Sequence, residues 1–180
     1  GWLGPLCAAD PEERVVSVEG VIAVLCVGYR GARQHRFPAG GDDCILAGTW
    51  SIEHGEELGI DPTRVAVGED SGGGNLAASV SMSLSQTTID PPIAAQFLVY
   101  PALDALADTP SRREFSHGYF LESQHMAWFY DLYAPDHEDW NDARLSPLRA
   151  ESFVGLPHAV ILPARLDLLR DEAVQYAVKL

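Results

Sequence analysis

Residues Arg64–Ala78 have the sequence RVAVGEDSGGGNLAA, which is the most informative stretch of the chain. The β-branched residues at its start predict a short strand, Arg64–Val67, and regular apolar spacing after the glycines predicts a helix, Gly72–Ser85. Ser71 stands at the corner between them. A serine at such a corner is typical of a nucleophile elbow, whose tight turn lifts the hydroxyl above the carboxyl edge of a parallel sheet. The stretch therefore predicts a catalytic serine on an α/β fold.

Strands and helices alternate along the rest of the chain. Alternation with near-continuous apolar strands predicts a single α/β domain over residues 1–180, with a mostly parallel sheet covered by helices on both faces. Between residues 104 and 156 the alternation stops, and one aromatic helical segment predicts a helical insertion such as a lid. A long surface connection with one packed helix is the alternative. The other predicted elements are strands at Val21–Tyr29, Ile93–Tyr100 and Ala159–Leu162, and helices at Asp42–Leu58, ending at Gly59, and at Arg170–Leu180.

The composition narrows the class of partners. Lys and Arg number 12 and Asp and Glu 26, so the net charge of −14 argues against nucleic acids and anionic membrane surfaces. No apolar run approaches the ~18 residues of a membrane span. The 3 cysteines are odd in number and form no C-x-x-C pair, which favours a reducing, cytoplasmic compartment. We expect neither a metal nor a cofactor.

Two other interpretations of the serine stretch are open at this point. Ser71 could simply cap a helix, because serine is a favoured N-cap residue. The segment Gly72-x-Gly74-x-x-Ala77 also matches the dinucleotide-binding pattern. However, Glu69-Asp70-Ser71 separates the strand end from these glycines, and no second strand ends in an acidic residue at the expected place. No lysine follows the glycines, which excludes a phosphate-binding loop of the Walker type.

Six short motifs, spread along nearly the whole chain, carry a family resemblance. They are GW at Gly1-Trp2, YR at Tyr29-Arg30 followed by HRFPA at His35–Ala39, GEDSGGGNLA at Gly68–Ala77, YP at Tyr100-Pro101, SPL at Ser146–Leu148 and DLLRDE at Asp167–Glu172. Together they resemble the hormone-sensitive-lipase-like esterases of the α/β-hydrolase superfamily. Their elbow is GGDSAGGNLA, and GW is similar to the end of their His-Gly-Gly-Gly-aromatic oxyanion loop.

The resemblance implies a carboxylic ester hydrolase that acts on a small-molecule ester without a cofactor. Ser71 would be the nucleophile, and Asp167 would orient the catalytic histidine. Gly72 and Gly1 would supply oxyanion N–H groups. An alternative role for Asp167 is to cap the helix that begins near Arg170.

Departures from the family pattern lead to further expectations. Glu69 replaces the first glycine of G-x-S-x-G, and we expect it to crowd the elbow and to oppose the oxyanion. No histidine follows Asp167, although the family histidine lies beyond the triad acid. The strand that precedes the oxyanion loop is also missing, which is typical of a sequence incomplete at both ends. We therefore expect these residues alone to be nearly inactive, and a relative that only binds small molecules is the alternative. We place none of the 6 histidines as the general base: His35, His54, His117, His125, His137 and His158.

Overall fold

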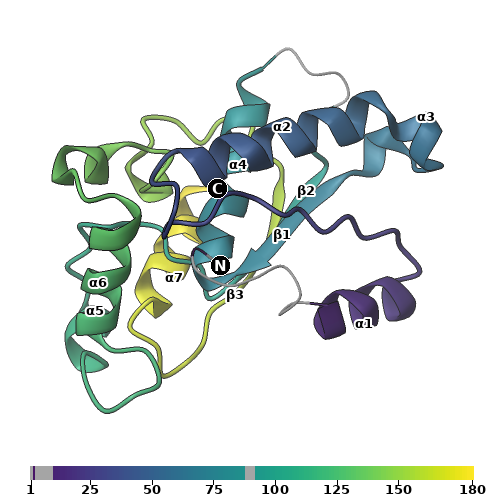
Figure 1. The fold of residues 1–180 in the computed structure, drawn as a ribbon. Helices are drawn as coiled ribbons and strands as arrows, with labels where there is room; N and C mark the ends of the chain where they lie inside the picture. The colour runs from purple at the N-terminus through teal and green to yellow at the C-terminus, as the bar shows by residue number, and fades with distance from the viewer. Residues whose placement is uncertain (1, 3–9, 88–91) are drawn as a thin grey trace.

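A computed structural model describes residue 2 and residues 10–87 and 92–180. Within these ranges three strands form one sheet in the order β1-β2-β3, and both pairs are parallel (Figure 1). They are β1 (Ala66–Asp70), β2 (Ala95–Val99) and β3 (His158–Leu162). The parallel sheet is confirmed, and β1 runs three residues further than predicted.

The helices connect and flank these strands. The predicted helix Asp42–Leu58 is divided at His54 into two helices, and Gly59 ends the second with a φ of +68°. Such a left-handed residue after a helix is a common stop, because glycine has no Cβ to clash. The helices are α1 (Asp10–Gly20), α2 (Ala39–Glu53), α3 (Gly55–Leu58), α4 (Ser71–Ser85), α5 (Pro110–Glu114), α6 (Ser123–Tyr133) and α7 (Arg170–Lys179), and the 3₁₀ turns are Pro62–Arg64, His137–Asn141 and Pro147–Arg149.

One face of the sheet carries the packed helices. Leu98 is fully buried beneath α4 and α7, and the Tyr176 hydroxyl of α7 donates to Gln96 Oε1 at 3.2 Å. Because side chains alternate along a strand, the neighbouring Phe97 and Val160 point to the other face, where they are 42% and 54% exposed. In the described residues the expected helix cover is therefore found on one face only.

The predicted strand at Val21–Tyr29 is wrong. These residues form no ladder, and Val21 and Leu25 are 90% and 55% exposed. An extended segment becomes a strand only when a neighbour pairs with its N–H and C=O groups. The sheet of the described residues consists of β1, β2 and β3 alone, so no neighbouring strand pairs with this segment. The segment therefore has the apolar composition of a strand but is not part of the sheet.

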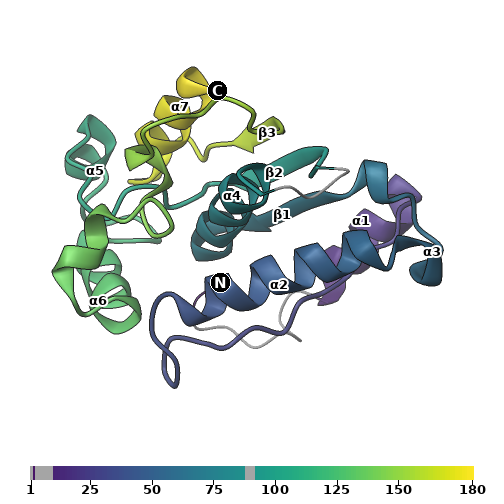
Figure 2. The same ribbon diagram turned by 90° about the horizontal axis from the view of Figure 1, so that it is seen from above.

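Residues 104–156 contain helices and turns but no strand. In both views α5 and α6 lie on one side of the molecule, and α1 and α3 lie on the opposite side (Figures 1 and 2). The side-chain amide of Asn75 in α4 donates to Ala102 O at 2.8 Å and to Leu145 O at 2.7 Å. One buried side chain thus joins α4 both to the segment just before this insertion and to Leu145 within it.

Candidate active site

The junction between β1 and α4 has the geometry of a sharp elbow. β1 ends at Asp70, α4 begins at Ser71, and Ser71 has a φ of +50°. A residue with a Cβ in the left-handed region costs on the order of 1 kcal/mol or more and persists only where its surroundings fix it. Asp70 is the N-cap residue of α4, so the alternative that Ser71 caps the helix is wrong. The strained backbone points instead to a functional role for Ser71.

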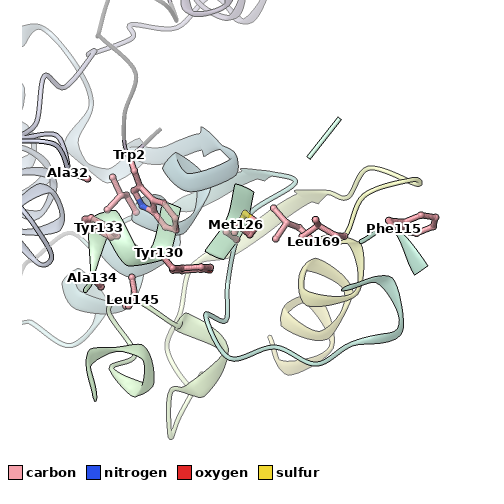
Figure 3. Close-up of a cluster of buried hydrophobic side chains, with 12 residues drawn as sticks. Trp2, Ala32, Phe115, Met126, Tyr130, Tyr133, Ala134, Leu145 and Leu169 are labelled. Atoms are coloured by element: carbon pink, nitrogen blue, oxygen red, sulfur yellow. The ribbon is translucent and has the colours of Figure 1, made fainter. Parts of the chain in front are cut away.

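Gly72 lies in the first turn of α4, where backbone N–H groups have no partner within the helix. The indole of Trp2 covers it, because a Cβ added at Gly72 would lie 3.0 Å from Trp2 Cδ2. Trp2 stacks on Tyr133 with ring centroids 4.9 Å apart and is tilted against Tyr130 at 5.0 Å (Figure 3). The predicted oxyanion residue Gly1 lies outside the described residues.

The aromatic residues of α6 belong mainly to the core. Tyr130 and Tyr133 are each 2% exposed, whereas Trp128 is 53% exposed. Tyr130 and Tyr133 pack with Trp2, Leu145 and Leu169 in one cluster (Figure 3). These buried rings therefore connect the insertion to the elbow rather than lining an open pocket.

Glu69 lies directly against α4. Its Oε1 accepts the backbone N–H of Asp70 at 3.1 Å, and a Cβ added at Gly73 would overlap its carboxylate. Burial raises the pKa of Tyr29, and the Glu69 carboxylate adds to the increase. The elbow accommodates the glutamate because position 73 has no side chain.

We expect Gly73→Ala to destabilise the protein by about 1 kcal/mol, because the added methyl forces the Glu69 side chain to move and to lose its bond with the Asp70 N–H. In a Glu69→Gly background the same change should cost much less, since the space is then empty. Urea unfolding of the two single variants and the double variant measures this coupling. Equal costs of Gly73→Ala in both backgrounds would show that Glu69 moves aside freely.

Asp167 follows β3 and lies at the same sheet edge as Ser71. Parallel strands end at one edge, and β2 separates the two outer strands, which are about 10 Å apart. Asp167 Oδ1 accepts Leu169 N–H at 2.9 Å, and Asp167 O accepts Arg170 N–H at 3.1 Å. The N-cap position of α7 is Leu169, two residues after Asp167, so the bond from the Leu169 N–H places Asp167 at the turn that leads into this helix. Burial raises the pKa of Asp167, against the opposing effects of the Leu169 N–H and Arg112.

Tyr100 stands between these two positions, at the end of β2. Its φ is +35°, its N–H donates to Leu162 O at 2.8 Å, and its hydroxyl donates to Asp70 Oδ2 at 3.0 Å. Burial raises the pKa of Tyr100, and the carboxylates of Asp70 and Asp167 add to the increase. Two adjacent strands are therefore each followed directly by a left-handed residue at the candidate site.

Tyr100→Phe is expected to lower the free energy of unfolding by about 1 kcal/mol, which is the typical loss of one hydrogen bond. Urea unfolding of the variant beside the parent protein measures it. Tyr119→Phe is the control, because Tyr119 is 40% exposed. An equal effect of the two changes would assign no stabilising role to the bond with Asp70.

Several of the histidines have neighbours of their own, away from the elbow. His54 Nδ1 is 3.0 Å from Trp50 O, His117 contacts Glu122, and His137 contacts Asp131. His158 begins β3 at the amino edge of the sheet, where it lines a pocket with Leu156 and Leu180, among other residues. Within the described residues no hydrogen bond joins a histidine to Ser71, and the role of general base stays unassigned.

A buried charge pair behind the site was missed by sequence reasoning. Glu172 is fully buried, and its Oε1 accepts Arg112 Nε–H at 2.6 Å. Its Oε2 accepts the N–H groups of Leu103 and Asp104 at 2.9 and 3.0 Å. Glu172 belongs to the DLLRDE motif, which could have drawn attention to it. Arg112 lies in the insertion and carried no comparable signal.

The described residues contain neither a candidate metal site nor a candidate membrane-spanning helix. No group of three or more His, Cys, Asp or Glu side chains is placed to hold a metal ion in this part of the chain. No helix within the same ranges has both the length and the apolar character to cross a membrane.

Comparison with known proteins gives consistent matches. A family profile described as alpha/beta hydrolase fold matches residues 4–180. The carboxylic ester hydrolase LipN of Mycobacterium tuberculosis is 41% identical over 98% of this chain and 49% of its own length. The ethyl acetate hydrolase of Pseudomonas putida is 41% identical over 87% of this chain and 49% of its own length. The crystal structure of a thermostable esterase from Pseudomonas putida superposes with a TM-score of 0.94 and 35% identity, covering 98% of this chain and 56% of that one. The chain spans about half the length of the curated relatives it matches.

Proposed function

The chain belongs to the family of proteins with the alpha/beta hydrolase fold, and from this premise we propose that the protein is a carboxylic ester hydrolase with Ser71 as its nucleophile. The observation that carries the proposal is the left-handed φ of +50° at Ser71, between a parallel strand and a helix. The resemblance to hormone-sensitive-lipase-like esterases supports it, as do relatives named as ester hydrolases.

In the proposed reaction, Ser71 Oγ attacks the ester carbonyl carbon and the alcohol leaves. The resulting acyl-serine is then hydrolysed by water, which releases the acid. The Gly72 N–H, at the amino end of α4, donates to the oxyanion of the tetrahedral intermediate. Asp167 orients and stabilises the protonated general base, which the family resemblance gives as a histidine.

The substrate class and the setting are part of the same proposal. The substrate is a small-molecule ester, as the names of the relatives support. Residues 104–156 form a lid over the elbow, since α6 packs on Trp2 and Trp2 covers Gly72. We place the protein in the cytoplasm, on the grounds of its odd number of cysteines and their spacing.

Covalent labelling of Ser71 tests the proposal. Diethyl p-nitrophenyl phosphate would be incubated with the protein in the presence of imidazole as an external base. Ser71 Oγ displaces p-nitrophenolate, its proton passes to imidazole, and a stable diethylphosphoryl group stays on the serine. Mass spectrometry of peptides should find the added mass on Ser71. The control is Ser81→Ala, which removes a buried serine of the same helix and should still be labelled.

Labelling that persists in Ser71→Ala would contradict the assignment of the nucleophile. Reversible binding of an ester without any adduct would favour the alternative of a small-molecule-binding protein. Without imidazole, we expect residues 1–180 to hydrolyse an activated aryl ester barely above the uncatalysed rate, because no described histidine contacts Ser71.

A further inference from the structure

Ser111, the second residue of α5, lies against the turn that follows Asp167. Ser111 is fully buried, although it comes from the insertion and lies 56 positions before Asp167 in the sequence (167 − 111). Its Oγ donates to Leu168 O at 2.9 Å, and its N–H donates to Asp171 Oδ2 at 2.8 Å. Two hydrogen bonds thus run from α5 to the two ends of the turn at residues 168–171.

The Ser111 hydroxyl has its full set of partners. Its single hydrogen is used by Leu168 O, so the Thr109 hydroxyl, 3.2 Å away, is the donor in their contact. The Asp171 N–H donates to the second lone pair at 3.2 Å. A hydroxyl with one donor and two acceptor contacts inside a buried site holds its neighbours in one arrangement.

The turn that Ser111 holds is the turn that holds Asp167. The backbone N–H of Leu169 donates to Asp167 Oδ1. In the same turn, the carbonyl oxygen of Leu168 accepts the hydrogen of the Ser111 hydroxyl. The position of the Leu168 carbonyl fixes the following peptide plane, because the peptide unit is planar. That plane contains the Leu169 N–H. The orientation of the donor to Asp167 is therefore set from α5.

We infer that Ser111 is a positioning residue, which fixes the Asp167 carboxylate through the Leu168–Leu169 peptide and so couples the insertion to the triad acid. The assignment rests on the proposed function for the role of Asp167 as the acid. The contacts themselves do not depend on that role.

Nuclear magnetic resonance of the Leu169 amide tests the inference. In the ¹⁵N-labelled protein, the Leu169 amide shift should follow the titration of the Asp167 carboxylate that accepts its hydrogen. In Ser111→Ala we expect the amplitude of this pH-dependent shift to fall to less than half. Ser51→Ala is the matched control, since Ser51 is 7% exposed and donates to Ala47 O at 2.7 Å, in α2. Ser111→Thr retains the hydroxyl and should restore most of the amplitude.

The outcomes separate this inference from the proposed function. An unchanged amplitude in Ser111→Ala, or an equal loss in Ser51→Ala, would overturn the positioning role whatever the labelling of Ser71 shows. A selective loss in Ser111→Ala supports it even if Ser71 fails to react with the organophosphate. In that case the hydrolase proposal fails, and the coupling between α5 and Asp167 stands.

Discussion

Replacement of Glu172 by alanine is expected to lower the free energy of unfolding by about 3–5 kcal/mol, because it leaves the Arg112 guanidinium without its buried partner. The Glu172 side chain is fully buried and the Arg112 side chain is 13% exposed. Burial raises the pKa of Glu172, while Arg112 and the N–H groups of Leu103 and Asp104 lower it. The attraction between the two charges therefore offsets the cost of burying them. When one charge is removed, the other stays buried and its desolvation cost is no longer offset.

Urea unfolding followed by circular dichroism measures the effect. The matched control is Asp108→Ala, which removes the acid of the exposed ion pair with Arg113 and should cost less than about 1 kcal/mol. The double variant Arg112→Met/Glu172→Leu should lose much less than the sum of the single changes, because no charge stays buried. Additive losses would mean that the two side chains contribute independently.

Asn75→Ala is the second large effect, with an expected loss of about 2–4 kcal/mol. The change removes the donor from two buried carbonyl groups, Ala102 O and Leu145 O, and each unsatisfied group costs about 1–3 kcal/mol. One carbonyl lies just before the insertion and the other within it, so the loss should also loosen the attachment of the insertion to α4. The effect should exceed that of any single surface change.

Thermal unfolding and hydrogen exchange measure both parts of this prediction. The amides of α6 should exchange faster in Asn75→Ala, while those of α2 should keep their protection. Asn141→Ala is the control, because Asn141 is an exposed residue at the end of a 3₁₀ turn. A loss of stability without faster exchange in α6 would contradict the role of Asn75 as the link between the insertion and α4.

Local patterns predicted the elements that depend mainly on their own residues. The strand and helix around Ser71 follow from apolar spacing and glycines, and both were found within a few residues of the predicted bounds. The prediction of a strand at Val21–Tyr29 was wrong because a strand forms only when a second strand pairs with it. The apolar composition of the segment does not show whether such a partner is present.

The candidate site shows the same division between local and distant information. Sequence motifs placed Ser71 and Asp167 at the ends of parallel strands, which fixes their edge of the sheet. The contacts of Ser111 with the turn after Asp167 and of Arg112 with Glu172 join segments that are far apart in the chain. No local period or spacing predicts such contacts. Likewise, the Glu69 side chain fits only because residue 73 is a glycine. The sequence pattern identifies Gly73 as part of the elbow but does not predict its contact with Glu69.

The left-handed backbone at position 71 has a consequence for the evolution of this protein in the laboratory. Glycine adopts that φ without the Cβ penalty, so Ser71→Gly should relax the junction between β1 and α4. Selection for thermal tolerance alone would then favour loss of the proposed nucleophile, since stability favours glycine at position 71 whereas the proposed activity requires serine. A library built for robustness should therefore hold position 71 fixed and draw its gains from exposed residues such as Val18 and Val178, which are 74% and 81% exposed.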